Sequence, residues 1–175
     1  MKTSPAQALA RFLARLLLAS RRADYRRIAK FARHVRGAQI LELGSGKAER
    51  YSARRLFHPS NGFVTSDINP EYGHAIIDVT SMEFHEHFDV ILCLNVLEHV
   101  YDFREAIRRI HQGLRPGGVA IIVVPVFYPL HDEPNDFWRF TEHALRRLLA
   151  DFRSLAIHCR GLRQYPFFYY LEARK

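Results

Sequence analysis

The sequence contains few cysteines and no long uninterrupted apolar run. Only two of its 175 residues are cysteine, Cys93 and Cys159, and both lie in apolar stretches without the spacing of a metal-ligand motif. So few cysteines exclude a disulfide framework and favour a reducing, cytoplasmic location. The only candidate for a targeting segment is LARFLARLLLAS at residues 9–20. It is interrupted by Arg11 and Arg15, and it is too short to span a bilayer.

Acidic residues are nearly absent from the first 36 residues, which contain ten Lys or Arg but only one acid, Asp24. The remaining residues contain 26 − 10 = 16 bases and 18 − 1 = 17 acids, so the formal charge of +8 arises in the N-terminal segment. Apolar residues recur there at three- and four-residue steps, which predicts an amphipathic helix: Leu9, Phe12, Leu13, Leu16 and Leu17. We therefore divide the chain into a basic helical segment, residues 1–36, and a main domain, residues 37–175. An anionic partner, RNA or a membrane surface, would meet the first of these.

From residue 39 onward, short apolar runs alternate with charged segments of helical pattern. This alternation predicts seven strands, at residues 39–43, 62–66, 74–78, 88–94, 119–124, 155–159 and 167–171. Helices are expected at 24–35, 47–57, 103–114 and 141–150, with Asp102 and Thr141 as N-caps and Glu105 completing a capping box. Strands separated by helices favour right-handed crossovers and a parallel sheet. The fold class is therefore α/β: a doubly wound, Rossmann-like sheet of about seven strands, mostly parallel with a C-terminal antiparallel hairpin, preceded by N-terminal helices.

The glycine turn ILELGSGKAE at residues 40–49 lacks the defining features of two phosphate-binding loops. It has neither the glycine spacing nor the Lys-Ser/Thr pair of a Walker loop. Glu49 occupies the third glycine position of a dinucleotide turn, where it would lie beside phosphate charge. Gly44 and Gly46 still allow a ligand close to the backbone. Glu42 supplies negative charge for a cationic ligand, and Asp67, at the end of the second strand, can accept both hydroxyls of a ribose. The pattern predicts a nucleoside site without phosphate.

Five stretches resemble the class I S-adenosylmethionine-dependent methyltransferases of type 11: ILELGSG (40–46), TSDINP (65–70), IIDVTSMEF (76–84), FDVILCLNVLEHV (88–100) and LRPGGVAIIVVP (114–125). They follow the family's order and nearly its spacing over residues 38–160. The resemblance implies S-adenosylmethionine as cofactor, in-line methyl transfer to an unidentified small-molecule acceptor, and the strand order 3-2-1-4-5-7-6. It also implies the cofactor-binding residues. Glu42, Gly44 and Gly46 line the methionine side, Asp67 holds the ribose diol with Ile68 beside it, Asp78 and Val79 flank the adenine, and Asn95 lies beneath the methionine moiety.

The chain departs from the family pattern in two places. Only six residues separate Asp67 from His74, which is too short for the usual crossover helix and predicts a bare loop. Some family members bind a divalent metal through an acidic residue three positions before a Glu-His pair. Here the pair is Glu98 and His99, but position 95 is Asn, so no metal is expected. The run His-Glu-His at residues 85–87 is interpreted as a solvated loop, because no third ligand follows at a useful spacing.

The stretch HDEPNDFWRFTEHALRRLL at residues 131–149 resembles a segment that covers the substrate pocket in a subset of these methyltransferases. A general base is required only if the acceptor is protonated at neutral pH, with His131 or Asp136 as first choice and His99 as second. Trp138 and Arg139 either contact the substrate or form a stacked pair that anchors the stretch. Two alternatives stay open for the whole chain. It could be an RNA methyltransferase whose residues 1–36 bind phosphates, or a non-catalytic binding protein on the same fold.

Overall fold

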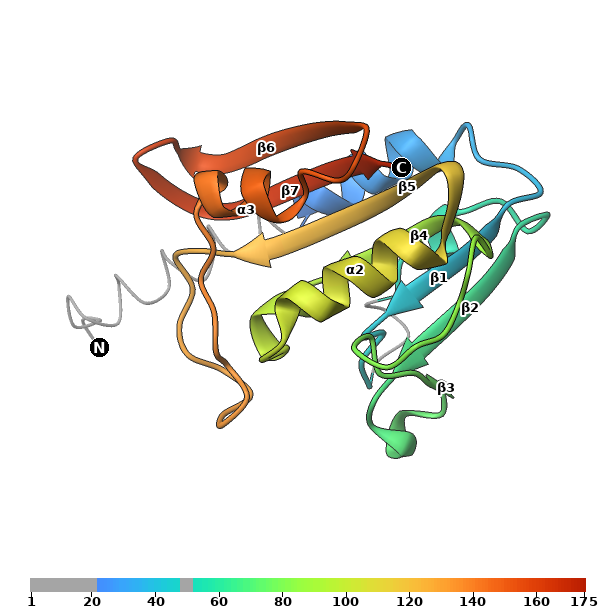
Figure 1. The fold of residues 1–175 in the computed structure, drawn as a ribbon, viewed down its shortest axis with the longest axis horizontal. Coiled ribbons are helices and arrows are strands. Elements are labelled where there is room, and N and C mark those ends of the chain that lie inside the picture. Colours follow the sequence, from blue (N-terminus) through green and yellow to red (C-terminus); the bar gives the residue numbers. More distant parts are fainter. Residues whose placement is uncertain (1–21, 48–51) are drawn as a thin grey trace, which may run out of the picture.

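The computed structural model describes residues 22–47 and 52–175, which form a seven-stranded mixed sheet with helices on both faces (Figure 1). The strand order is β3-β2-β1-β4-β5-β7-β6; β7 is antiparallel to both neighbours, and the other pairs are parallel. The predicted class, strand order and C-terminal hairpin are confirmed. The strands are β1 (Gln39–Leu43), β2 (Gly62–Asp67), β3 (Ala75–Ile76), β4 (Phe88–Leu94), β5 (Leu114–Pro125), β6 (Ser154–Leu162) and β7 (Tyr165–Arg174). The helices are 22–32, α2 (Phe103–Gly113) and α3 (Glu142–Leu148).

The central strands β1 and β4 are mostly apolar because both of their faces are covered. Ile40 and Leu92 pack with Ile28 of helix 22–32 in one core. Leu41 and Cys93, one position further along β1 and β4, point the other way and pack with residues of α2 and α3 in a second core. Successive strand residues face opposite sides, so a strand in the middle of three layers is expected to be apolar at most positions.

Helix 22–32 is an integral part of this packing. Ile28 is completely buried, and Asp24 at its first turn forms an ion pair with Arg160 of β6, with Oδ1 and Nε 3.2 Å apart. Burial raises the pKa of Asp24 even beside this arginine. The C-terminal half of the basic segment thus shares a core with the sheet, and the division at residue 36 stays a prediction. The amphipathic stretch at residues 9–17 lies outside the described residues. Within the described ranges, no helix combines the length and apolar character that crossing a membrane requires.

Both predicted N-caps are present, although the capping box is not closed. The Asp102 carboxylate accepts the Glu105 N–H at 3.1 Å, and Thr141 caps α3 in the same way. The Glu105 side chain does not reach back to residue 102. It pairs instead with Arg108 and Arg109 on the following turn, because two cations three and four residues away compete for it.

The connections around β1 and β2 are less regular than the sequence pattern predicts. The described part of the expected helix at 47–57 contains only the 3₁₀ turn η2 (Arg54–Leu56). The Ala53 N–H donates to the Glu42 carboxylate at 2.7 Å, so it cannot join an α-helical ladder. The link from β2 to β3 has no crossover helix, as predicted, and contains the 3₁₀ turn η3 (Pro70–Tyr72). β3 itself is only two residues long.

Candidate active site

The turn that follows β1 contains two glycines in the left-handed conformation. Gly44 has a φ of 64° and Gly46 a φ of 71°, values that residues with a Cβ rarely adopt. A Cβ on Gly44 would collide with Val96 just beyond β4, whereas a Cβ on Gly46 would meet no described atom within 4 Å. Gly44 thus allows the ends of β1 and β4 to approach closely. Gly46 leaves open space where a ligand could lie against the backbone.

The end of β2 holds this turn in place. The Gly46 N–H donates to one Asp67 oxygen at 2.9 Å, and the other oxygen accepts the Asn69 N–H at 3.0 Å. His74, which the sequence analysis did not identify, lies with Nε2 2.9 Å from the Gly46 carbonyl oxygen. A carboxylate has about four lone-pair sites, and these contacts occupy two of them. Asp67 is therefore fixed against the glycine turn and keeps acceptor capacity for a further ligand.

Glu42 fixes the other side of the turn. Its buried carboxylate accepts hydrogen bonds from the hydroxyls of Ser45 and Ser52 and from the Ala53 N–H. These bonds tie β1 to Ser52 and Ala53. The negative charge predicted for a cationic ligand is present beside the turn, and both oxygens already have protein partners.

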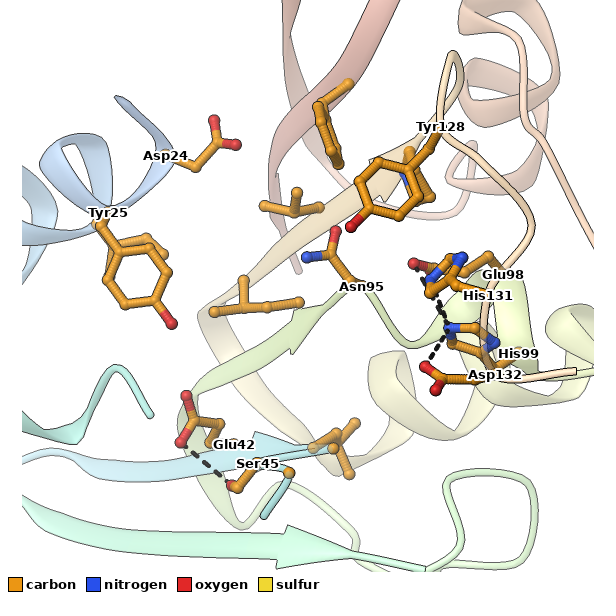
Figure 2. Close-up of a pocket in the computed structure, with 18 residues that line it drawn as sticks. Asp24, Tyr25, Glu42, Ser45, Asn95, Glu98, His99, Tyr128, His131 and Asp132 are labelled. Atoms are coloured by element: carbon orange, nitrogen blue, oxygen red, sulfur yellow. Dashed lines mark hydrogen bonds and ion pairs between the residues drawn. The ribbon is translucent and has the colours of Figure 1, made fainter. Parts of the chain in front are cut away.

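A cavity of about 350 Å³ opens above the glycine turn, at the carboxyl ends of β1 and β4 (Figure 2). This is the point where the strand order reverses, which is where open α/β sheets bind ligands. Helix 22–32 contributes Asp24, Tyr25 and Ile28 to the wall, and the chain beyond β5 contributes Tyr128, His131 and Asp132. These residues, apart from His131, were not among the predicted site residues, because no local motif marks them. The cavity is thus lined by segments that are far apart in the sequence.

Four of the eight predicted cofactor residues line this cavity: Glu42, Gly44, Gly46 and Asn95. The other four belong to the expected ribose and adenine side. Asp67 lies directly behind Gly46, and Ile68 is 70% exposed beside it. Val79 is buried, while the Asp78 carboxylate accepts hydrogen bonds from the backbone N–H and the hydroxyl of Thr80. The roles of these residues stay predictions.

Asn95 sits in a special conformation at the end of β4. Its φ of 54° is left-handed, a region that Asn tolerates better than most residues with a Cβ. Its N–H donates to Val123 of β5 at 2.9 Å, and its Oδ1 has no hydrogen-bond partner among the described residues. In Figure 2 the side chain lies between Glu42 on one side and the histidines on the other. An unpaired buried acceptor favours a ligand that carries a donor.

The segment between β5 and α3 is held by one arginine. Arg139 donates to both oxygens of Asp136, at 2.6 and 2.8 Å, and to the carbonyls of Tyr128, Pro129 and Trp138. The Arg139 hydrogen bonds hold the pKa of the Asp136 carboxyl well below its usual range. Arg139 is thus a clamp within the segment, and Asp136 is a fixed anion.

Trp138 packs as part of the same anchor. Its ring makes an edge-to-face contact with Phe103 at 5.0 Å between centroids and a tilted contact with Tyr101. Trp138 and Arg139 do not line the cavity above the glycine turn. They line a second, mostly apolar cavity of about 440 Å³ under residues 126–130. The geometry therefore favours the anchoring interpretation over direct substrate contact.

Two histidines and a glutamate meet on the wall of the first cavity. The Nε2 atoms of His99 and His131 are 3.2 Å apart. Glu98, in the 3₁₀ turn η4 (Leu97–His99), is completely buried, and its Oε1 is 3.9 Å from His99 Nε2. Neither Glu98 oxygen has a hydrogen-bond partner among the described residues. Burial raises the pKa of this carboxyl to about 8. Figure 2 shows the three side chains converging from η4 and from the segment after β5.

The sheet order, the glycine turn and the acid at the end of β2 define a methyltransferase-like α/β fold. Residues 6–158 match the model of a family described as a methyltransferase domain, and the chain belongs to this family. The ubiquinone biosynthesis O-methyltransferase of Pseudomonas syringae pv. tomato is 33% identical over 84 residues, which cover 48% of this chain and 34% of that protein. The chain thus spans about a third of the length of the curated relatives it matches.

Solved structures of low identity share the fold. The 1,6-didemethyltoxoflavin-N1-methyltransferase of Burkholderia thailandensis, solved with 1,6-didemethyltoxoflavin and S-adenosylhomocysteine, is 20% identical, with a TM-score of 0.64, over 100% of this chain and 92% of that one. The [4+2]-cyclase SpnF is 15% identical, with a TM-score of 0.64, over 90% of this chain and 81% of that one. One fold therefore carries different chemistry, and the reaction must be argued from the site.

Proposed function

We propose that the chain binds S-adenosylmethionine above the glycine turn and transfers its methyl group to a small-molecule acceptor. The observation that carries the proposal is the hydrogen bond from the N–H of Gly46, which lines the cavity, to the carboxylate of Asp67 behind it. One backbone position without a Cβ and one fixed carboxylate offer the close approach and the diol acceptor that a nucleoside requires. The methyltransferase domain family and the toxoflavin methyltransferase with bound S-adenosylhomocysteine support this cofactor.

In this reaction an acceptor atom attacks the methyl carbon, the carbon–sulfur bond breaks, and its electron pair stays on sulfur. The products are the methylated acceptor and S-adenosylhomocysteine. The sulfonium is intrinsically reactive, so the protein chiefly has to align the two reactants and exclude water. A protonated acceptor must also lose a proton, and His131 and His99 are the candidate bases that face the cavity as long as no metal ion occupies their Nε2 atoms. Asp136 is assigned a positioning role, because Arg139 and the His131 backbone N–H engage its carboxylate.

Two glycine variants test the cofactor site with matched backbone strain. Gly37 and Gly46 have φ values of 63° and 71°, and neither has a described atom within 4 Å of an added Cβ, but only Gly46 lines the cavity. Each Ala variant should lose about 1 kcal/mol of stability from strain. Calorimetric titration with S-adenosylhomocysteine should show weaker binding by Gly46→Ala and unchanged binding by Gly37→Ala. No binding by the wild type, or equal loss in both variants, would refute the site.

The same protein preparations can distinguish methyl transfer from two other functions, a non-transferring role and binding to RNA or a membrane. The cyclase neighbour on this fold keeps a non-transferring role open, and retained cofactor binding without methyl transfer to a panel of phenols, amines and carboxylates would favour it. The basic residues 1–36 are the reason to keep RNA or an anionic membrane as a partner. A chain that begins at residue 22 keeps Asp24 and Tyr25 in the cavity wall and should bind the cofactor normally. Salt-sensitive RNA or vesicle binding that disappears in this truncated chain would support the alternative. The low cysteine content supports a cytoplasmic location.

A further inference from the structure

The two histidines of the cavity wall present lone pairs to each other. His99 Nδ1 is 2.8 Å from the Asn135 carbonyl oxygen. His131 Nδ1 is 3.2 Å from both the Pro129 carbonyl oxygen and the Asp136 carboxylate. Each Nδ1 therefore faces an acceptor and must carry the ring's proton. A neutral imidazole has one N–H, so both Nε2 atoms are unprotonated acceptors. They lie 3.2 Å apart, and a positive charge between them is needed to make this arrangement favourable.

Carboxylates surround the same point. Glu98 is completely buried with both oxygens unpaired among the described residues, and its Oε1 is 3.9 Å from His99 Nε2. Asp132 Oδ2 is also 3.9 Å from that nitrogen, from the exposed side. The ligand atoms of Glu98, His99 and His131 all lie within 4.8 Å of one another. A fully buried carboxylate without a partner is costly unless it is protonated or a cation neutralises it.

We propose that Glu98, His99 and His131 bind a divalent transition metal ion, with Zn²⁺ as the best match. Two nitrogens bound to tetrahedral Zn²⁺ at about 2.0–2.1 Å are roughly 3.3–3.4 Å apart, close to the separation in the structure. The glutamate has to approach the imidazoles by about 1 Å to complete the set. The fourth position faces the cavity, where Asp132, water or an acceptor oxygen can occupy it. Mg²⁺ and Ca²⁺ prefer oxygen ligands and do not suit a pair of imidazoles.

The surroundings hold both histidines in the ligating orientation. A metal-bound imidazole usually donates its second N–H to a carbonyl or carboxylate, which fixes the ring and its tautomer. The Asn135 carbonyl does this for His99, and Asp136 with the Pro129 carbonyl does it for His131. The Arg139 clamp in turn fixes Asp136. The anchored segment after β5 thus serves to deliver His131 to the pair in η4.

This inference revises the expectation drawn from position 95. The sequence argument placed the missing ligand three residues before Glu98, where Asn95 stands, and therefore expected no metal. The structure brings the third ligand from 32 residues further along the chain. The rival run at 85–87 does not form such a cluster: His85 is exposed and contacts the Gln112 side chain.

The test is a titration of the untagged, chelator-treated full chain with Zn²⁺ in the absence of cofactor. We expect one equivalent to bind with a dissociation constant of roughly 1 µM or tighter. Co²⁺ should produce visible absorption bands of low-symmetry coordination. His131→Ala should weaken Zn²⁺ binding by roughly 100-fold or more and remove the Co²⁺ bands. His99→Ala is the second variant if His131→Ala does not fold, and circular dichroism reports folding.

His85→Ala is the matched control, and its Zn²⁺ affinity should equal that of the wild type. The proposal is overturned if the wild-type chain takes up no Zn²⁺ at 100 times the expected constant, or if His85→Ala loses as much affinity as His131→Ala. Because no cofactor is present, the result is independent of whether the chain binds S-adenosylmethionine.

Discussion

Replacing Glu98 by Gln should stabilise the metal-free protein, and the gain should grow with pH. The carboxyl is completely buried, and burial raises its pKa from 4.5 to about 8. Arg139 partly opposes this shift, while Asp132 and Asp136 reinforce it. Gln has nearly the same shape but no charge, so the substitution removes the cost of ionising the group inside the fold.

The sign follows from proton binding. Between pH 4.5 and 8 the unfolded chain has an ionised Glu98 and the folded chain a protonated one, so unfolding releases a proton and stability falls as pH rises. Each pH unit in this window costs about 1.4 kcal/mol. From pH 6 to pH 8 the wild type therefore loses about 3 kcal/mol through this group, and little more above pH 8. The Gln variant has no such term.

The assay is urea unfolding of both proteins at pH 6 and pH 9 in excess chelator. The difference in unfolding free energy between Glu98→Gln and wild type should increase by about 3 kcal/mol over this interval. Groups far from residue 98 are the same in both proteins and largely cancel in the comparison. The unsatisfied amide of Gln adds a cost that does not vary with pH. A difference that stays constant between pH 6 and pH 9 would refute the buried, unpaired carboxyl.

Three further changes test other parts of the structure. Asp67→Asn keeps the side-chain shape but should weaken S-adenosylhomocysteine binding by about 1.5–3 kcal/mol in calorimetry; unchanged affinity would contradict the ribose role. Arg139→Lys loses the bidentate bond to Asp136 and should lower the unfolding free energy by about 1–3 kcal/mol. A urea midpoint equal to that of wild type would show that the clamp is dispensable. Cys93 and Cys159 lie on β4 and β6, with β5 and β7 between them, so non-reducing mass mapping should find no bond joining them.

The sheet could be predicted because its determinants are local. β1, β4 and β5 each contain a mostly apolar run, and such runs between helical segments favour a parallel sheet covered on both sides. The strand order came from the family resemblance of five motifs, since pairing between distant strands leaves no signal in one sequence. The N-caps Asp102 and Thr141 were recognisable because a cap and its helix are neighbours in the chain. The expected helix at 47–57 was wrong over its described part, because the distant Glu42 carboxylate takes the Ala53 N–H.

The candidate site likewise has one part that is set by local sequence and one part that is set by contacts between distant residues. Gly44, Gly46 and Asp67 belong to motifs whose geometry follows from a strand end and a turn, and the structure brings them together as expected. The other wall of the cavity comes from Asp24 and Tyr128, which are about 100 residues apart in the chain and which only the fold brings together. No spacing rule connects such residues.

His131 shows why chemistry in long connections is hard to predict from sequence. Its residue type made it a candidate base, but its role depends on what its two nitrogens face. One nitrogen faces a carboxylate held by Arg139, and the other faces a second imidazole from a different part of the chain. Both relations are set by the path of the segment between β5 and α3, which is irregular and is fixed by side-chain hydrogen bonds instead of a ladder. A residue that sequence alone can describe only as a possible proton acceptor becomes, once those contacts are known, one of three ligands around a single point.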